Sequence, residues 1–297
     1  MKKSLVAFIV LGLCSLSFAG NSDTAIVNPK QAAAESAEML ARQATVLSPF
    51  ATAACSFTFT SAANDNFLQY CVTANGNIAQ LETPQGHEHI AHGVVGEGYG
   101  ICDVSTNTEY FDYSQFGDSP NWLAPTVVNQ TANSVKIART TADGIWTLTQ
   151  TFTQMAGASP FVKVAMTLKN NTAIDRTIFL MRYADVEPDH SFSPNLGATS
   201  NSAFVWDQTT FANVPFRSTF GLLLQGLALP QQQLPNAGPQ GLVEANDLVD
   251  PPPPCNPYKN FVSGSQSENA FGTIVMIYSL GVPKKASKSV TVNYRGI

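Results

Sequence analysis

Charged residues are scarce in this sequence, and the shortage excludes several classes of protein. Asp, Glu, Lys and Arg make up 12% of the 297 residues, about half of the quarter that is usual in globular domains. The formal net charge is −5, and beyond the first residues the only grouping of cations is Lys284, Lys285 and Lys288. Because nucleic acids and anionic membrane surfaces are bound through clustered cations, neither is expected as a partner.

Long apolar runs are scarce as well. One such run covers residues 5–16 after a short basic start, and it is shorter than the roughly 20 residues that a membrane-spanning helix needs. Ser17 and Ala19 then place small residues where a signal peptidase reads, so residues 1–19 are predicted to be a signal peptide. The sequence therefore predicts a secreted or periplasmic protein with no transmembrane segment in the mature chain.

Four of the five cysteines remain once this leader is removed. An even number in an exported chain predicts disulfides, and the CxxC spacing of a zinc knuckle is absent. Of the three pairings that four cysteines allow, we favour Cys55 with Cys71, which lie on neighbouring strand-like segments, and by elimination Cys102 with Cys255. Cys14 would make the chain a lipoprotein only if a small residue preceded it, where leucine stands.

Nucleotide-binding and serine-nucleophile motifs and internal repeats are also missing. Residues 96–100 are rich in glycine but lack the spacing of a phosphate-binding loop. No repeat of fixed period is visible, which disfavours a propeller or a solenoid.

What the sequence does contain is a two-residue alternation of apolar and polar side chains. Asn75-Gly76 and Asp143-Gly144 each join two such segments, and both dipeptides favour the tight turns of β-hairpins. About ten strands without alternating helices predict an all-β chain, a large antiparallel β-sandwich of jelly-roll or supersandwich type. The expected strands cover residues 57–59, 67–73, 77–81, 135–137, 146–152, 162–168, 178–186, 203–206, 271–278 and 290–294.

The segment before the sandwich differs in composition. Residues 31–44 are rich in Ala, Glu and Gln, which favour helix, but their apolar face is mostly alanine and would bury little surface. The domain plan is therefore a signal peptide over residues 1–19, a short helix or loosely held arm over residues 20–50, and a sandwich domain over residues 51–297.

Two long loops are expected to carry function, because loops of such length in a rigid domain usually do. Residues 96–125 are rich in aromatic side chains, and residues 230–257 contain four consecutive prolines, which form a stiff stretch. Sugars stack on aromatic rings and bind carboxylates, so the first loop is the predicted ligand site; its candidate residues are Tyr110, Tyr113, Trp122 and Asp112. The alternative is that these rings cover one end of the core.

Two further groups of side chains are candidate metal sites. Imidazole is a common ligand of zinc and copper, and three histidines lie close together: His87, His89 and His92. Hard oxygen ligands suit calcium, and three alternating carboxylates would share one side of an extended chain: Asp185, Glu187 and Asp189. Pro188 indicates that the strand ends there, so the alternative for both groups is a set of solvated polar residues.

Three functions remain open at this stage. The leading hypothesis is a secreted protein that binds a glycan or a cell-surface partner without catalysing a reaction. The first rival is a carbohydrate-active enzyme that uses paired carboxylates from Asp185, Glu187 or Asp112 with a nearby histidine. The second rival is a structural surface protein, which needs neither a cleft nor an aromatic platform. Zinc or calcium would be the cofactor if one is present.

Overall fold

A computed structural model describes residues 54–61, 67–90, 95–157, 159–186, 195–199, 202–207, 220–227, 239–244, 253–256, 264–267 and 272–297. The chain divides into two compact units, Met1–Ala44 and Thr45–Ile297, and all the described residues belong to the second. The predicted signal peptide and N-terminal helix or arm lie outside the described residues. No helix occurs among the described residues, so this part of the chain is all-β, as predicted.

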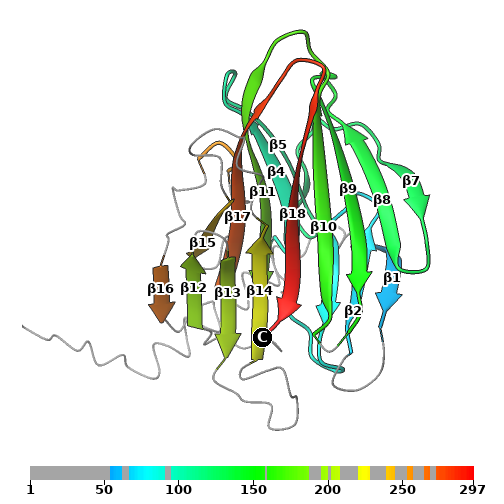
Figure 1. The fold of residues 1–297 in the computed structure, drawn as a ribbon, viewed down its shortest axis with the longest axis vertical. Helices are drawn as coiled ribbons and strands as arrows, with labels where there is room; N and C mark the ends of the chain where they lie inside the picture. Colours follow the sequence, from blue (N-terminus) through cyan, green and yellow to red (C-terminus); the bar gives the residue numbers. More distant parts are fainter. Residues whose placement is uncertain are drawn as a thin grey trace, which may run out of the picture. The chain divides into compact units, whose positions relative to one another are not determined.

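The largest sheet has nine antiparallel strands in the order β16-β12-β13-β14-β18-β10-β9-β8-β7 (Figure 1). Its central strands are long and regular, because Val, Ile, Thr and Phe suit a pleated and half-buried surface. The strands are β7 (Thr126–Gln130), β8 (Ser134–Thr140), β9 (Trp146–Met155), β10 (Phe161–Asn170), β12 (Asn195–Thr199), β13 (Ser202–Asp207), β14 (Phe220–Gly226), β16 (Gly264–Ser267) and β18 (Ser287–Gly296).

A second sheet has six antiparallel strands in the order β15-β17-β11-β4-β5-β6. The strands are β4 (Glu97–Asp103), β5 (Thr108–Tyr113), β6 (Gly117–Asp118), β11 (Arg176–Val186), β15 (Pro239–Glu244) and β17 (Gly272–Val282). A third, three-stranded sheet consists of β1 (Cys55–Thr60), β2 (Gln69–Thr73) and β3 (Ile78–Glu82). Side chains of all three sheets form one hydrophobic core, as expected of a β-sandwich.

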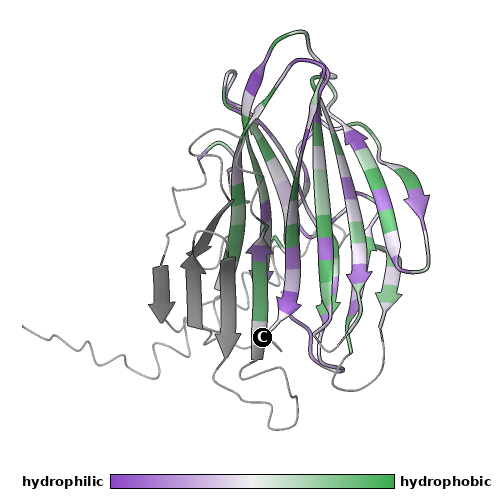
Figure 2. Cartoon of the chain, in the orientation of Figure 1, coloured by the Kyte–Doolittle hydropathy of each residue, from purple (hydrophilic) through white to green (hydrophobic). Residues whose placement is uncertain are grey.

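Alternation along the strands decides which side chains enter this core. Val162, Val164, Met166 and Leu168 of β10 are fully buried, while the three residues between them are half-buried. Figure 2 shows the same alternation as bands of opposite hydropathy along β8, β9 and β10. Strands β8, β9 and β10 of the nine-stranded sheet therefore have one apolar face and one polar face, the arrangement that lets an antiparallel sheet face water.

The six-stranded sheet differs, because its central strands β4 and β11 are buried on both faces. All seven residues of β4 are buried, and so are the last seven residues of β11. The inward face contributes to the main core. The outward face has its own apolar cluster, which contains Val95, Tyr113, Met181, Tyr183, Val275 and Ile277, with Phe111, Phe116 and Phe179 partly buried beside it.

Both hairpins predicted from the turn dipeptides are present. Gly76 has φ +91° between β2 and β3, and Gly144 has φ +72° between β8 and β9, values that favour glycine. The prediction of a loop over residues 96–125 is wrong, since β4, β5 and β6 lie within it. The alternation was hidden there because the outward side of β4 consists of Gly98, Gly100 and Cys102 rather than large apolar residues.

Candidate functional site

The predicted ligand residues lie on both faces of the six-stranded sheet. Tyr110 and Asp112 of β5 point inward and are 0% and 1% exposed, whereas Tyr113 belongs to the outward cluster and is 0% exposed. Trp122 is 9% exposed and packs edge-on against Tyr110, with 6.1 Å between the ring centroids. The structure thus brings Tyr110, Asp112 and Trp122 together and separates Tyr113 from them.

Arg139 of β8 is the residue around which this group is built. Its Nη1 donates to Asp112 Oδ2 at 2.5 Å and its Nη2 donates to Asp118 Oδ2 at 2.6 Å. Its guanidinium lies 5.0 Å from the centroid of the Trp122 ring, within the range of a cation–π contact. We call Asp112, Asp118, Trp122 and Arg139 the Arg139 cluster.

Strand register explains why two carboxylates meet here. Asp112 of β5 lies directly opposite Asp118 of β6, and like charges at opposed positions repel each other. A cation is therefore needed between them, and Arg139 supplies it from the other large sheet. Arg139 is only 4% exposed, so its own charge is stable there because both carboxylates bind it.

The turn between β2 and β3 holds Asp112 from a third direction. Asn75 Nδ2 donates to Asp112 Oδ2 at 2.8 Å, and Asn77 Nδ2 donates to the Asp112 carbonyl oxygen at 3.0 Å. Burial raises the pKa of Asp112, the charge of Arg139 opposes that rise, and the charge of Asp118 adds to it. Asp112 is therefore a buried anchor of the cluster with no direct access to solvent.

Access to the Arg139 cluster is through Asp118. The Asp118 side chain is 37% exposed, and Leu123 beside Trp122 is 51% exposed. The Trp122 ring is fixed in place, because its Nε1 donates to the Phe111 carbonyl oxygen at 3.1 Å. The arrangement offers a ligand one oriented carboxylate and one exposed apolar side chain.

A second charged cluster is completely enclosed. Arg182 of β11 binds both carboxylate oxygens of Glu97 through Nε and Nη2, and both residues have side chains that are 0% exposed. The Tyr294 hydroxyl donates to Glu97 Oε1 at 2.6 Å, and the Ile78 N–H donates to Oε2 at 2.6 Å. We call Glu97, Gln150, Arg182 and Tyr294 the Arg182 cluster, and its full enclosure indicates a structural role.

The same β2–β3 turn completes the Arg182 cluster. Arg182 Nη1 donates to Gln150 Oε1 at 2.5 Å, and Nη2 donates to the Gly76 carbonyl oxygen at 3.3 Å. The Tyr99 hydroxyl, which accepts from Arg139 Nη1 at 3.2 Å, donates to the Asn75 carbonyl oxygen at 2.9 Å. Residues 75–77 therefore link the two clusters.

Of the members of both clusters, only Asp112 and Trp122 were predicted to be ligand residues, although the sequence also contains a signal for Arg139 and Gln150. Arg139 follows Val135 and Ile137 in the buried phase of β8, and Gln150 stands between the buried residues Leu148 and Phe152 of β9. A polar residue in the apolar phase of a strand must find a buried partner. The position of a polar residue in the buried alternation of a strand therefore indicates that it has a buried partner, but it does not identify that partner.

The predicted histidine site is described only in part. His89 is 0% exposed, with Nε2 2.7 Å from the Thr83 carbonyl oxygen, His87 is half-buried, and His92 lies outside the described residues. The Glu88 carboxylate accepts the backbone N–H groups of Leu81 and Ile90. Among the described residues, no group of three His, Cys, Asp or Glu side chains could hold a metal ion.

The predicted carboxylate row is likewise described in part. Asp185 lies at the end of β11 on the outward face and is 2% exposed, and its backbone N–H donates to the Gly96 carbonyl oxygen at 3.0 Å. Glu187 and Asp189 lie outside the described residues. A calcium site or a catalytic pair in this row remains a prediction.

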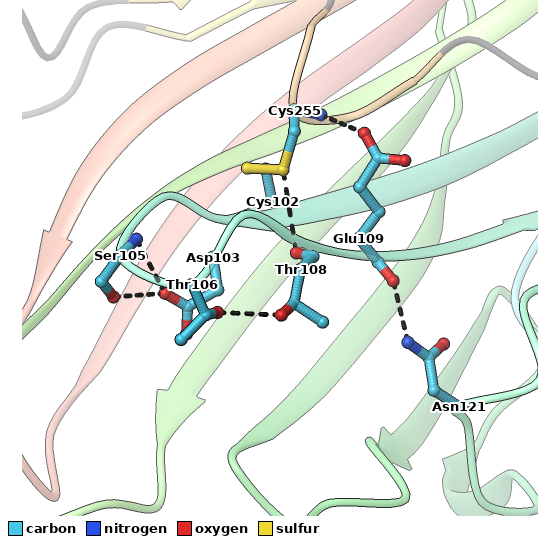
Figure 3. The surroundings of a disulfide bond; sticks show 8 residues. All are labelled: Cys102, Asp103, Ser105, Thr106, Thr108, Glu109, Asn121 and Cys255. Carbon is cyan, nitrogen blue, oxygen red and sulfur yellow. Dashed lines mark hydrogen bonds between the residues drawn. A yellow bond between two sulfur atoms is a disulfide. The ribbon is translucent and has the colours of Figure 1, made fainter.

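Both favoured disulfides are present. Cys55–Cys71 joins β1 to β2, and Cys102–Cys255 joins β4 to a segment 153 residues further along the chain. Figure 3 shows the second bond and the hydrogen bond from the Cys255 N–H to Glu109 Oε1, which is 2.8 Å long. Disulfides are compatible with a protein outside the cytoplasm. In the part of the chain that the structure describes, no helix has the length and apolar character needed to cross a membrane.

Comparison with known proteins identifies the fold. No protein-family model matches the chain, and no curated protein matches its sequence. A bacterial glucoamylase complexed with acarbose is similar in structure, with a TM-score of 0.51, 11% identity and coverage of 84% of this chain; the chain spans only 33% of the glucoamylase.

Two smaller proteins align over most of both chains with lower scores. A galactose mutarotase related enzyme from Lactobacillus acidophilus has a TM-score of 0.42 at 6% identity and covers 81% of this chain and 97% of its own. The GalM/aldose epimerase homologue from C. elegans has a TM-score of 0.46 at 8% identity, with coverage of 82% and 99%. The likeness to glucoamylase shows a shared large β-sandwich fold.

Proposed function

We propose that this chain is an exported carbohydrate-binding protein and that the sugar binds over the Arg139 cluster. The observation that carries the proposal is the position of Asp118, a carboxylate held at 2.6 Å by a buried arginine and still 37% exposed. The Asp118 carboxylate is already held in one rotamer by Arg139. It can therefore accept hydrogen bonds from sugar hydroxyl groups with little further loss of side-chain entropy on binding.

The surroundings of Asp118 fit a sugar better than an apolar ligand. Leu123, whose carbonyl oxygen accepts from Arg139 Nε at 3.3 Å, offers an exposed apolar contact, and Trp122 forms the aromatic part of the buried wall beneath the cluster. Small-molecule sites commonly combine apolar and aromatic walls with a few fixed polar groups. The similar glucoamylase is complexed with acarbose, which supports a carbohydrate as the class of ligand.

Binding is favoured over hydrolysis because only one carboxylate of the cluster is accessible. Most glycosidases use two carboxyl groups that flank the scissile bond. Asp112 is 1% exposed and is held by Arg139 and Asn75, so it cannot take part in proton transfer to a sugar on the surface. A carbohydrate-active enzyme therefore remains the second candidate, with a structural surface protein as the third.

A glycan array probed with the mature protein tests the proposal. Asp118→Asn keeps the shape of the side chain and removes its charge, so we expect it to weaken sugar binding about tenfold or more, equivalent to about 1.4 kcal/mol. The matched control is Asp175→Asn, an exposed aspartate on the turn after β10, which should leave binding unchanged.

Two results would contradict the proposal. Either no glycan binds the wild-type protein, or both variants bind as the wild type does. Release of reducing sugar from a bound glycan would instead favour the enzyme. Export is tested separately by N-terminal sequencing of the purified protein, which should begin after Ala19.

A further inference from the structure

The outward face of the six-stranded sheet contains a trough that the Arg139 cluster does not use. Its floor is Gly98, Gly100 and Cys102, the three outward positions of β4. Gly98 lies between Tyr113 and Tyr183 in the register of the sheet, and Gly100 lies between Phe111 and Met181. Because the two glycines have no side chains, the outward rows of large side chains are interrupted along β4, and we call this interruption the trough.

One end of the trough is closed by aromatic rings. A Cβ atom at Gly98 would lie 2.6 Å from the Tyr113 ring, and the Tyr113 and Tyr183 rings meet edge to face with centroids 5.6 Å apart. At Gly100, in the middle, the atoms nearest to an added Cβ belong to Pro254 and Met181. At Gly100 the space is filled from elsewhere in the chain.

The group that fills it is a proline. A Cβ atom at Gly100 would lie 2.6 Å from Pro254 Cγ, so the proline ring rests directly on the glycine. Pro254 is buried, whereas Pro253 and Cys255 are half-buried and Asn256 is exposed. We call residues 253–256 the strap.

Two bonds hold the strap beside the trough. Cys255 is joined to Cys102 on the floor of the trough, and its N–H donates to Glu109 Oε1 at 2.8 Å (Figure 3). The strap then turns away, because the Asn256 N–H donates to the Pro253 carbonyl oxygen at 3.1 Å. The contact on the sheet is therefore short and depends on the ring of Pro254.

We infer that the trough is a binding site for an extended, proline-containing peptide, that the strap fills it in cis, and that the Cys102–Cys255 disulfide controls access. Polyproline segments bind aromatic-lined grooves because their backbone is already extended and loses little entropy. The strap displays this mode within one chain, with Phe111 and Met181 as walls and the Glu109 carboxylate as the acceptor for a backbone N–H.

Opening the trough requires an exchange reaction with a dithiol. The dithiol gives up two electrons and two protons and becomes a disulfide, and Cys102 and Cys255 become thiols. Without the covalent bond, the local concentration of Pro254 at the trough falls, because the strap is then held only by noncovalent contacts. A peptide in solution can compete with it.

A fluorescently labelled peptide Pro-Pro-Pro-Pro-Ser-Asn, which is residues 251–256 with serine in place of cysteine, tests this inference by fluorescence anisotropy, because it keeps the backbone N–H that Glu109 accepts. We expect it to bind Cys102→Ser/Cys255→Ser and not the oxidised wild type. Cys55→Ser/Cys71→Ser is the matched control, because it removes the other disulfide and leaves the strap attached. Adding Gly100→Ala to the open variant should weaken binding about tenfold or more, since the new Cβ takes the space of a proline ring.

Binding lost with Gly100→Ala would establish the trough as the site. Two results would overturn the inference. One is that Cys102→Ser/Cys255→Ser has a native circular dichroism spectrum and does not bind the peptide. The other is that its affinity for the peptide is unchanged by Gly100→Ala. If the double serine variant does not fold, dithiothreitol added to Cys55→Ser/Cys71→Ser reduces the Cys102–Cys255 bond in an otherwise folded protein. The same peptide must then bind on reduction, and failure to bind would overturn the inference.

Discussion

The Arg182 cluster makes a strong prediction about stability. Glu97→Gln keeps the shape of the side chain but gives it one amide group in place of a carboxylate oxygen. Each oxygen of Glu97 receives two donors, Arg182 Nε with the Tyr294 hydroxyl at one and Arg182 Nη2 with the Ile78 N–H at the other. An amide in either position therefore faces two donors, and Arg182 loses its counter-ion.

The magnitude follows from complete burial. Removing one partner of a buried ion pair costs about 3–5 kcal/mol, since the remaining charge is left without compensation. This is a large part of the roughly 5–15 kcal/mol by which native proteins are stable. For a domain of this size, each kcal/mol lowers the melting temperature by about 2–4 °C, so a decrease of about 6–20 °C is expected.

Urea unfolding, followed by circular dichroism and tryptophan fluorescence, measures this loss. Asp175→Asn makes the same chemical change at an exposed site and should alter the free energy of unfolding by less than about 0.5 kcal/mol. A Glu97→Gln variant within about 1 kcal/mol of wild type would refute the view that Glu97 compensates the buried charge of Arg182.

The remaining predictions concern backbone contact, pH and the long-range disulfide. Gly98→Ala should prevent folding or lower the melting temperature sharply, because its Cβ would lie 2.0 Å from the Asp112 carbonyl oxygen; thermal unfolding measures this, and a wild-type melting temperature would contradict it. The pKa of Asp143 is lowered, because hydrogen bonds from Thr141, Tyr110 and the Ile145 N–H outweigh the opposing effect of burial. A lowered carboxyl pKa stabilises the fold above the unfolded pKa of about 3.9, and this contribution is lost as pH falls through the folded pKa. As the pH falls from 5 through the folded pKa, the free energy of unfolding of wild type should therefore decrease more than that of Asp143→Asn. Urea titrations at each pH measure both values, and equal decreases would show that the Asp143 carboxylate does not stabilise the fold. Removing Cys102–Cys255 should cost about 2–5 kcal/mol, which calorimetry of the double serine variant measures; no change would show that the bond does not restrict the unfolded chain.

Local chemistry explains why part of the fold was predictable. Asn75-Gly76 and Asp143-Gly144 supply the positive φ of a tight turn within the sequence itself, and alternation along β10 fixes its buried face without reference to any partner. Strands β4 and β5 were missed because their outward faces hold glycine, cysteine and glutamate beside the aromatic residues, a pattern typical of an aromatic loop.

The candidate site was less predictable, because it depends on pairing. Asp112 and Trp122 could be selected by residue type, but nothing local joins them to Arg139 of the facing sheet or to Asn75 of a distant hairpin. Tyr113 and Tyr110 are the same residue type in the same aromatic-rich segment, so sequence could not distinguish them, but they lie on opposite faces of β5. One residue of register decides between the two faces.

The sequence by itself determined an all-β chain, its best hairpins and its set of four cysteines, since turn propensity and period-two alternation act between near neighbours. Tertiary structure alone decided that the charges of Glu97, Asp112, Arg139 and Arg182 are buried in pairs, and that Pro254 rests on Gly100. These contacts join residues that are far apart in the chain. Their energies exist only after the sheets have closed and removed water from the groups between them.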